Sequence, residues 1–432
     1  MLNKLRLGFI IVFLFGLFFI LAVNLIGQEL LPSRQIEVQG ANLAQIVLKS
    51  ECNLKENIEI GKKLLEASFP LKIVEKEHRT KLKNGKYRVR YELIRKQVAL
   101  AVLDTNSCNV FEVRYWLDEN DIQRGNHLRK TRQDNPGDVP KFMPVDQSSN
   151  LSVNVNWWNN HNSDLSVVEN GSSEPSHYIV VGNKFSVSND NIAYPKEITG
   201  SRYSDITYVP YSVLIHTEEF DKNGNDFMGQ NVNEVGEELD NLGIESRAYP
   251  GKLVTETITP EFVKNILITE HVDPPSIFIS DDNGRMLAGR IFIRYATNGE
   301  KAFRYTFSKT GASGAGQIMP GTYGTVPGAY PGANLIKDID LGRVDFKNGI
   351  KATFLILDMK LAEIEAKVKT SSRAKKIWAS KTLEQKQEAV AASYNGGSTK
   401  YKHLTGTISL AVQETVDFVR KFKMIRDLKL FD

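Results

Sequence analysis

The sequence Gly-Ala-Ser-Gly-Ala-Gly-Gln-Ile-Met-Pro at positions 311–320 is the most informative stretch of this 432-residue chain. Its glycines Gly311, Gly314 and Gly316 allow the backbone to approach a bulky ligand closely. Gln317 follows them and can offer both a hydrogen-bond donor and an acceptor to a ligand. A glycine-rich stretch alone is most often a plain turn, so its meaning depends on the segments around it.

Helical signals surround this stretch from Thr259 onward. Thr259-Pro260 is a typical helix start, with the threonine as cap and the proline at the first helical position. This helix should end near Asp273-Pro274-Pro275, because a helix rarely continues into a proline pair. Thr382 and Gln385 form a capping box at the start of a later helix. We therefore predict helices that begin at Thr259 and Thr382 and others over about 347–367 and 410–423.

Three later segments follow the glycine-rich stretch in a fixed order. They are the helix 348–361, Ala-Ser-Tyr-Asn-Gly-Gly at 392–397 and Glu-Thr-Val-Asp-Phe-Val at 414–419. Together with 311–320 they resemble the soluble lytic transglycosylase family of the lysozyme-like superfamily. That family shows Gly-Ala-x-Gly-Leu-Met-Gln-x-Met-Pro, Ala-Tyr-Asn-x-Gly and Glu-Thr-x-x-Tyr segments in this order. The resemblance covers about 259–432 and none of the first 250 residues.

The resemblance implies a mainly α-helical, lysozyme-like C-terminal domain and an enzyme without a cofactor. Its substrate would be peptidoglycan, whose glycan strands it would cut at the β-1,4 bonds between N-acetylmuramic acid and N-acetylglucosamine. The positions that match the family's substrate-binding segments, or lie beside them, are Ser308, Gly311, Ala312, Gln317, Met319, Tyr323, Tyr394, Asn395 and Glu414.

The family uses a single catalytic Glu at the end of the helix that precedes the glycine-rich stretch. Glu270 ends the Thr259 helix and begins Glu-His-Val-Asp-Pro, which is similar to the family's motif with one residue missing, but it requires an insertion of about 30 residues. Glu300 lies at the usual distance from Gly311, yet it begins a helix, where a Glu is most often placed for the helix dipole. We favour Glu270 and keep Glu300 as the alternative.

The resemblance also implies a mechanism. The Glu must be protonated at neutral pH to donate to the leaving oxygen, and apolar surroundings raise a carboxyl pKa. Ile266, Leu267 and Met319 are candidates for such apolar walls. The same Glu would then take a proton from the C6 hydroxyl of muramic acid, which closes a 1,6-anhydro ring. Tyr394 would lie beside the Glu, and Gln317 would bind substrate.

Three departures from the family pattern affect these expectations. Ala315-Gly316 replaces the usual Leu-Met, Phe418 replaces the final Tyr, and His271 stands where Ser is common. Two alternative functions therefore remain open. One is hydrolysis, as in goose-type lysozymes, which needs a second acid to hold water. The other is an inactive peptidoglycan-binding scaffold.

The N-terminus predicts export. Lys4 and Arg6 precede an apolar run from Leu7 to Val23, which Asn24 interrupts. A run of this length can span a bilayer, and the basic flank keeps the N-terminus cytoplasmic. We predict a single-pass signal anchor at 1–33 in the cell membrane, with the remainder on the periplasmic or extracellular side. A cleaved signal peptide and a secreted protein are the alternative.

The cysteines, the histidines and the net charge bear on three further questions: a disulfide, a metal site and a nucleic-acid partner. In an exported protein Cys52 and Cys108 are more often disulfide-bonded than free, with two buried thiols as the alternative. The seven His residues show no zinc-binding spacing, so we expect no metal site. The formal net charge of +4 is spread along the chain, which indicates no nucleic-acid partner.

Composition suggests five segments and an α+β protein overall. The segment 34–125 reads as a small α+β domain, with a helix near Ile58–Leu65 and a hairpin at Asn84-Gly85. Residues 126–192 are rich in Asn, Ser and Asp and predict a linker or loop-rich region. For residues 193–258 we predict a region of mixed secondary structure that packs on the catalytic domain, which we place at 259–432. Envelope proteins are possible partners of 34–250.

Overall fold

The computed structural model describes residues 52–131, 141–142, 150–171, 176–188, 202–272, 278, 280, 282–306, 308 and 310–431. The predicted anchor at 1–33 lies outside these residues. No helix in these described ranges has the length and the apolar character needed to cross a membrane. The chain divides into two compact units, Met1–Val47 and Leu48–Asp432, and the description below concerns the second. This unit mixes α-helices with antiparallel sheets.

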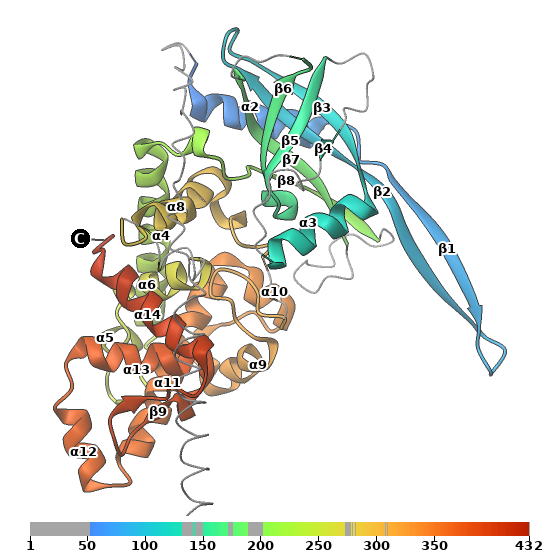
Figure 1. The fold of residues 1–432 in the computed structure, drawn as a ribbon. Helices are drawn as coiled ribbons and strands as arrows, with labels where there is room; N and C mark the ends of the chain where they lie inside the picture. The colour runs from blue at the N-terminus through green and yellow to red at the C-terminus, as the bar shows by residue number, and fades with distance from the viewer. Residues whose placement is uncertain are drawn as a thin grey trace, which may run out of the picture. The chain divides into compact units, whose positions relative to one another are not determined.

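The first half of this unit is built on a five-stranded antiparallel sheet (Figure 1). Helix α2 (Leu54–Ala67) precedes the sheet, as the apolar spacing predicted. The strands follow in the order β1-β2-β7-β8, and β3 pairs with β2. Their bounds are β1 Ile73–Lys81, β2 Tyr87–Asp104, β3 Asn109–Asp118, β7 Tyr178–Ser188 and β8 Tyr203–Tyr208. The predicted hairpin is confirmed, and Gly85 in its turn has φ +80°.

Strand β2 holds the sheet together because both of its faces are covered. Its buried run alternates between two cores, as the period of a strand requires. Val98, Leu100 and Val102 lie in one core, whereas the small alanines between them face α2 in the other. Only the second half of β2 has β3 and β7 as neighbours, so its first half pairs with β1 alone.

The predicted linker at 126–192 is wrong for much of its length. Strands β4 (Lys141–Phe142), β5 (Leu151–Trp157) and β6 (Asp164–Glu169) form a second sheet, and β7 pairs with both β2 and β8. Val153 and Val155 of β5 and Leu165 and Val167 of β6 are buried at alternate positions, and the Asn and Ser residues between them raise the polar composition. Average composition hides this period-two pattern. Helix α3 (Glu119–Thr131) also crosses the predicted boundary at 125.

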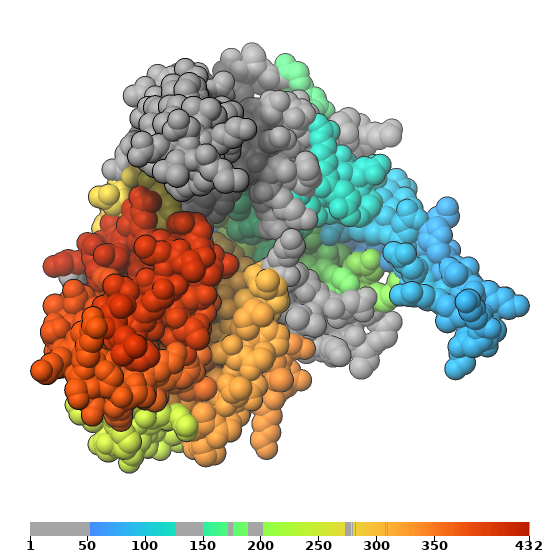
Figure 2. Space-filling model, turned by 60° about the horizontal axis from the view of Figure 1, so that its bottom comes forward, coloured from blue at the N-terminus to red at the C-terminus, as the bar shows by residue number. Residues whose placement is uncertain are grey.

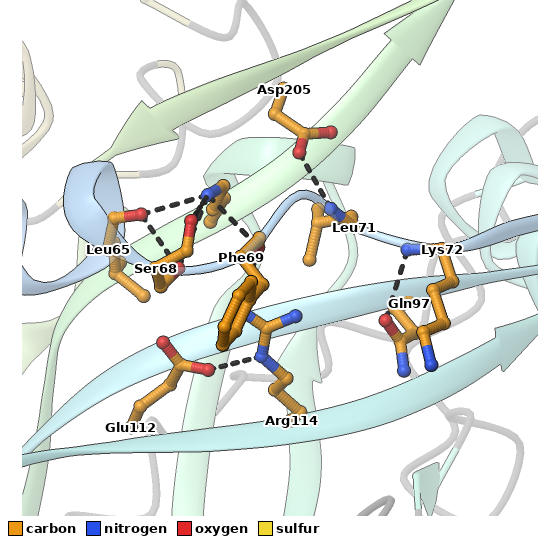
Figure 3. Close-up of polar contacts among 10 residues, drawn as sticks. Leu65, Ser68, Phe69, Leu71, Lys72, Gln97, Glu112, Arg114 and Asp205 are labelled. Atoms are coloured by element: carbon orange, nitrogen blue, oxygen red, sulfur yellow. Dashed lines mark hydrogen bonds and ion pairs between the residues drawn. The ribbon is translucent and has the colours of Figure 1, made fainter.

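A buried lysine, Lys184, connects α2 to the sheet through the residues Leu65 and Ser68, which are labelled in Figure 3. The Lys184 ammonium on β7 donates hydrogen bonds to the carbonyl oxygens of Leu65 at 3.0 Å and Ser68 at 2.9 Å. These carbonyls end α2 and carry the negative end of its dipole, where a cation is stabilising. Nearby, the backbone N–H of Leu71 donates to Asp205 at 2.8 Å. These hydrogen bonds therefore hold the segment between α2 and β1 against the sheet.

The predicted pairing of Cys52 with Cys108 is present as a disulfide, with Cα atoms 5.3 Å apart. It links the start of α2 to the β2–β3 turn across 56 residues. We predict that replacing both cysteines by serine lowers the free energy of unfolding by about 4 kcal/mol, because the loop is no longer closed in the unfolded chain. Urea denaturation with and without reductant measures this change. An equal midpoint for the oxidised wild type and the double variant would contradict it.

The second half of the unit is helical and surrounds one hydrophobic core. Its main helices are α4 Glu218–Asn241, α5 Val254–Thr257, α6 Pro260–His271, α8 Arg285–Asn298, α9 Pro320–Ala329, α10 Ile339–Val344, α11 Phe346–Val368, α12 Ser372–Ala379, α13 Leu383–Gly396 and α14 Gln413–Asp427. Strand β9 Tyr401–Lys402 pairs with β10 Thr407–Ile408. Short 3-10 helices in both halves of the unit are η2 Asn160–Asn162, η3 Val213–Ile215, η4 Gly299–Lys301, η5 Pro331–Ala333 and η6 Ser398–Lys400.

The predicted helix starts are confirmed, but the domain boundary at 259 is wrong. The Thr259 hydroxyl accepts from the N–H of Phe262, and Thr382 and Gln385 form the expected capping box. However, α4 lies before the boundary and packs against α8, α6 and α11. Its buried residues Met228, Val232 and Val235 belong to the same core as α11. The helical part therefore begins near Glu218.

Candidate active site

A cleft of about 180 Å³ lies between the glycine-rich stretch and the ends of α6, α13 and α14. It gathers side chains that the sequence places more than a hundred residues apart. Its lining residues are Glu270, Ser308, Thr310, Ala312, Gln317, Ile318, Met319, Thr322, Ile356, Tyr394, Asn395 and Glu414. Glu270 and seven of the nine predicted substrate-binding residues are therefore together in one concave site.

Two of the predicted substrate-binding residues, Gly311 and Tyr323, are not part of this lining. Tyr323 is completely buried, one turn into α9, where its hydroxyl donates to the Ile336 carbonyl at 2.6 Å. The Asn348 amide donates to the same hydroxyl, so this tyrosine is part of the core. Gly311 has φ +93° and makes a turn whose carbonyl accepts from Arg343.

The two candidate catalytic carboxylates lie in different places. Glu300 is exposed on η4 and borders a separate cavity with Lys62, Lys301 and Arg304. Glu270 is half-buried in the last turn of α6 and lines the cleft. Of the two, only Glu270 shares a cavity with Tyr394 and Gln317.

The surroundings of Glu270 favour its protonated form. Burial raises the pKa of Glu270 to about 8, because the charged form loses its hydration. The nearby Lys421 ammonium lowers this pKa, and the Glu414 carboxylate raises it. Lys421 is itself buried and donates to the Val272 carbonyl at 2.8 Å, just beyond the end of α6. A carboxyl in this setting can donate a proton at neutral pH.

His271 attaches the end of α6 to the glycine-rich stretch. Its Nε2 is 2.8 Å from the Ala315 carbonyl, and its ring stacks on Phe303 with centroids 3.7 Å apart. Burial, with a smaller contribution from the Arg294 charge, lowers the pKa of His271 to about 3. The imidazole is therefore neutral at physiological pH and donates its Nε2–H to Ala315. His271 is the residue next to Glu270 but is absent from the cleft lining.

Two glycines of the stretch 311–320, Gly314 and Gly316, leave no room for a Cβ atom. A Cβ on Gly314 would lie 1.9 Å from the Arg343 carbonyl oxygen, and this residue has φ +75°. A Cβ on Gly316 would lie 2.4 Å from the Thr353 hydroxyl and 3.2 Å from the Tyr394 hydroxyl. Gly316 thus has no side chain where the family has Met, and the Tyr394 hydroxyl lies against this backbone.

Gln317 has the unusual backbone angle φ +46° for a residue with a side chain. Such angles cost about 1–3 kcal/mol and occur often at functional sites. The Gln317 side-chain amide donates to the Gly314 carbonyl at 2.9 Å, which leaves its carbonyl oxygen as an acceptor. The side chain is therefore preorganised within the cleft lining.

The residue that holds the glycine-rich stretch in place is Arg343, which sequence reasoning missed. Its guanidinium is completely buried and donates to the carbonyls of Gly311 at 2.7 Å and Ile318 at 3.1 Å. It also bonds the Asp340 carboxylate at 2.8 Å. No local signal could have found it, because an arginine in a short helix reads as a surface residue.

Tyr394 and Asn395 complete the cleft from the end of α13. The Tyr394 hydroxyl donates to the Gly316 carbonyl at 2.6 Å. Burial, followed by the Glu270 charge, raises the pKa of Tyr394 well above its usual range, so the hydroxyl stays protonated. The side-chain oxygen Oδ1 of Asn395 accepts a hydrogen bond from the buried Thr415 hydroxyl at 3.0 Å. This bond joins α13 to the first turn of α14. That turn carries Glu414.

The apolar wall of the cleft differs from the predicted one. Met319 lines the cleft, but Ile266 and Leu267 are fully buried in the core. Ile318 and Ile356 take their place. The apolar face of α6 packs inward, so only its last turn reaches the cleft, whereas α11 is buried at every position from Asn348 to Asp358 and supplies Ile356.

A second and larger cavity, of about 1180 Å³, meets the cleft at Ser308. Its lining comes from both strands of the β1–β2 hairpin between His78 and Lys96, from β7 and from the segment after α8, and it includes Asn160, Phe185, Arg294 and Tyr305. The cleft therefore opens toward a space between the sheet and the helices that can hold a longer ligand.

The chemistry available in the cleft is that of the acid Glu270, with a second carboxyl at Glu414 and neutral hydrogen-bonding groups around it. Within the part of the chain that the structure describes, no group of three or more His, Cys, Asp or Glu side chains could hold a metal ion. Comparison of the chain with protein-family models, with curated proteins and with solved structures finds no match.

Proposed function

We propose that this protein is a lytic transglycosylase that cleaves the β-1,4 bonds between N-acetylmuramic acid and N-acetylglucosamine in peptidoglycan. The observation that carries the proposal is the position of Glu270, a carboxyl with a raised pKa that lines the same cleft as Tyr394 and Gln317. The order of the motif segments in the sequence supports the same function. We also propose that the protein is exported to the cell envelope, where peptidoglycan lies. The apolar run at residues 7–23 supports this localisation.

In the first step the protonated Glu270 donates its proton to the glycosidic oxygen. The bond between this oxygen and C1 of muramic acid breaks, and positive charge develops on the sugar ring. Burial keeps Glu270 protonated, and the neutral His271 beside it adds no charge. The Tyr394 hydroxyl and the Gln317 amide hold the sugar against the glycine backbone, where no side chain intervenes.

In the second step the Glu270 carboxylate takes the proton of the C6 hydroxyl of the same muramic acid. The C6 oxygen attacks C1, and the product is a 1,6-anhydro ring. The C6 proton replaces the one that Glu270 gave to the leaving oxygen, so Glu270 is protonated again and the reaction consumes no water. An intramolecular attack gains from proximity, so one carboxylate is sufficient.

Hydrolysis is a second candidate, because Glu414 lines the same cleft as Glu270. Glu414 is exposed at the start of α14 and could hold a water molecule on the opposite face of the sugar. The products distinguish the two reactions. Purified sacculi are digested and the fragments are analysed by mass spectrometry. We expect anhydro-muramic ends, and reducing ends in their place would establish hydrolysis.

We predict that cleavage persists at neutral pH and falls as the pH rises through the pKa of Glu270, near 8. The sign follows from the role of Glu270, which must carry its proton to act as an acid. With an ordinary carboxyl pKa, activity would already be lost above about pH 5. The rate of fragment release from sacculi, measured between pH 4 and 10, checks this.

The Lys421→Met variant is a matched test of the same pH dependence. Lys421 lowers the pKa of Glu270, so its removal should move the alkaline limb to higher pH. A limb that does not move, or that lies near pH 5 in the wild type, would contradict the assignment of Glu270 as the acid.

A further inference from the structure

The outer half of the β1–β2 hairpin carries a dense cluster of basic residues. Residues 76–91 contain seven Lys and Arg side chains and one Glu, whereas the whole chain has a net charge of only +4. The rest of the chain is therefore net acidic. In the sequence, Tyr, Val and Thr residues separate these basic residues, so no long run of positive charge is visible. Pairing of β1 with β2 brings the two basic segments together.

This part of the hairpin extends beyond β3 and β7, although His78, Thr80 and Arg90 at its base also line the larger cavity. Strands β3 and β7 pair with β2 only from Arg95 and Val98 onward, so among the described strands Thr80 and Arg88 pair with each other alone. Figures 1 and 2 show the hairpin reaching away from the neighbouring elements. Every residue from Glu77 to Glu92 is exposed. A two-stranded ribbon of this kind adds little to a core, which leaves its surface to be explained.

Most of the basic side chains on the ribbon lack an acidic partner. Arg79 pairs with Glu77, and His78 approaches Glu92 at 2.6 Å. Among the described residues, the remaining cations of the ribbon have no ion pair, namely Lys76, Lys81, Lys83, Lys86, Arg88 and Arg90. Unpaired cations of one sign repel each other, so the ribbon gains free energy when an anionic surface approaches it.

Apolar side chains lie between these cations near the tip. Leu82 is 41% exposed, Tyr87 is 61% exposed and Val89 is 42% exposed. Tyrosine is common at the interface of a bilayer, where its ring is buried and its hydroxyl is hydrated. A polyanion such as a nucleic acid or a wall polymer would use the cations and Tyr87, but it offers nothing to Leu82 and Val89. A lipid surface accommodates all of them.

We propose that the β1–β2 hairpin binds an anionic membrane surface, with Leu82, Tyr87 and Val89 at the lipid interface and the cations at the headgroups. Each Lys or Arg near such a surface strengthens binding about fivefold. The hairpin would hold the Leu48–Asp432 unit at the membrane by a contact separate from the apolar run at 7–23. This proposal does not depend on the proposed function.

The test uses residues 48–432, which form one compact unit with three hydrophobic cores and a disulfide, so that the apolar N-terminal run does not contribute. Binding is measured by co-sedimentation with phosphatidylcholine vesicles, with and without about a third of phosphatidylglycerol. We expect binding to the anionic vesicles only, weakened by salt. Neutralisation by Lys83→Gln, Lys86→Gln and Arg88→Gln should weaken it about a hundredfold.

The control variant removes the same number of charges from another exposed basic segment, by Arg373→Gln, Lys375→Gln and Lys376→Gln in α12. It should bind as the wild type does, and equal losses in both triple variants would overturn the proposal.

A Tyr87→Trp variant separates lipid from a soluble polyanion. Its tryptophan emission should shift to the blue with anionic vesicles and remain unshifted with heparin. A shift with neither probe, or binding to heparin alone, would also overturn the proposal.

Discussion

Glu270→Gln is expected to lower the rate of peptidoglycan cleavage by about a thousandfold, because the amide can neither donate nor accept the proton of the reaction. The substitution keeps the size of the side chain and its place at the end of α6. The measurement is the initial rate of soluble fragment release from sacculi. Binding of the variant to sacculi should remain, because the remaining cleft residues are unchanged.

Glu300→Gln is the matched control for this prediction. Glu300 is exposed and borders a different cavity, so cleavage should stay within about twofold of the wild type. Two results would contradict the assignment. A loss in Glu300→Gln with activity retained in Glu270→Gln would exchange their roles. No cleavage by the wild type would leave only the peptidoglycan-binding scaffold.

Loss of folding cannot explain the expected effect of Glu270→Gln. The folded-state pKa of Glu270 is raised, so the folded protein binds this proton more tightly than the unfolded chain does. The Glu270 contribution to stability therefore falls as the pH rises from about 4 toward 8. Gln carries no such penalty, so the variant should be at least as stable as the wild type at pH 7. Thermal unfolding at pH 5 and pH 7 measures this difference.

Gly314→Ala is expected to destabilise the protein by more than about 4 kcal/mol. The added Cβ would lie 1.9 Å from the Arg343 carbonyl oxygen, which is backbone in α10 and has no rotamer to change. The left-handed angle of φ +75° adds about 1–2 kcal/mol for a residue with a side chain. Relief of the contact would move the glycine-rich stretch away from Arg343. Urea denaturation measures the free energy of unfolding.

Gly321→Ala serves as the control for this prediction. Gly321 lies in the first turn of α9, and a Cβ added there would have no atom within 4 Å, so alanine should be neutral or stabilising by up to about 1 kcal/mol. Equal stability of Gly314→Ala and Gly321→Ala would show that the stretch can relax without cost. In that case the close packing of Gly314 would have no role in shaping the cleft.

Much of the helical part could be predicted from local patterns. The Thr259 cap and the Thr382–Gln385 capping box occur as expected, since each depends on residues within one helical turn. The hairpin at Gly85 was equally local. The strands within 126–192 were missed, because the high Asn, Ser and Asp content of the whole segment hid the apolar residues of β7, which β2 buries from far away in sequence.

The candidate site could be predicted only in part. The motif segments drew attention to Gln317, Tyr394 and Asn395, all of which line the cleft. Tyr323 belongs to the same kind of segment but faces the core, because the rotation of α9 decides which side is inside. Arg343 carries no sequence signal, since its role comes from carbonyls that reach it from another segment.

The sequence by itself determined the helix starts, the turns and the set of polar side chains from which a site could be built, because these depend on short-range backbone preferences. Only the tertiary structure decided that Glu270, and not Glu300, lies in the cleft. The physical reason is that a carboxyl pKa depends on the water and charges around it. Lys421 and Glu414, which act on Glu270, approach it from a helix that begins more than a hundred residues later.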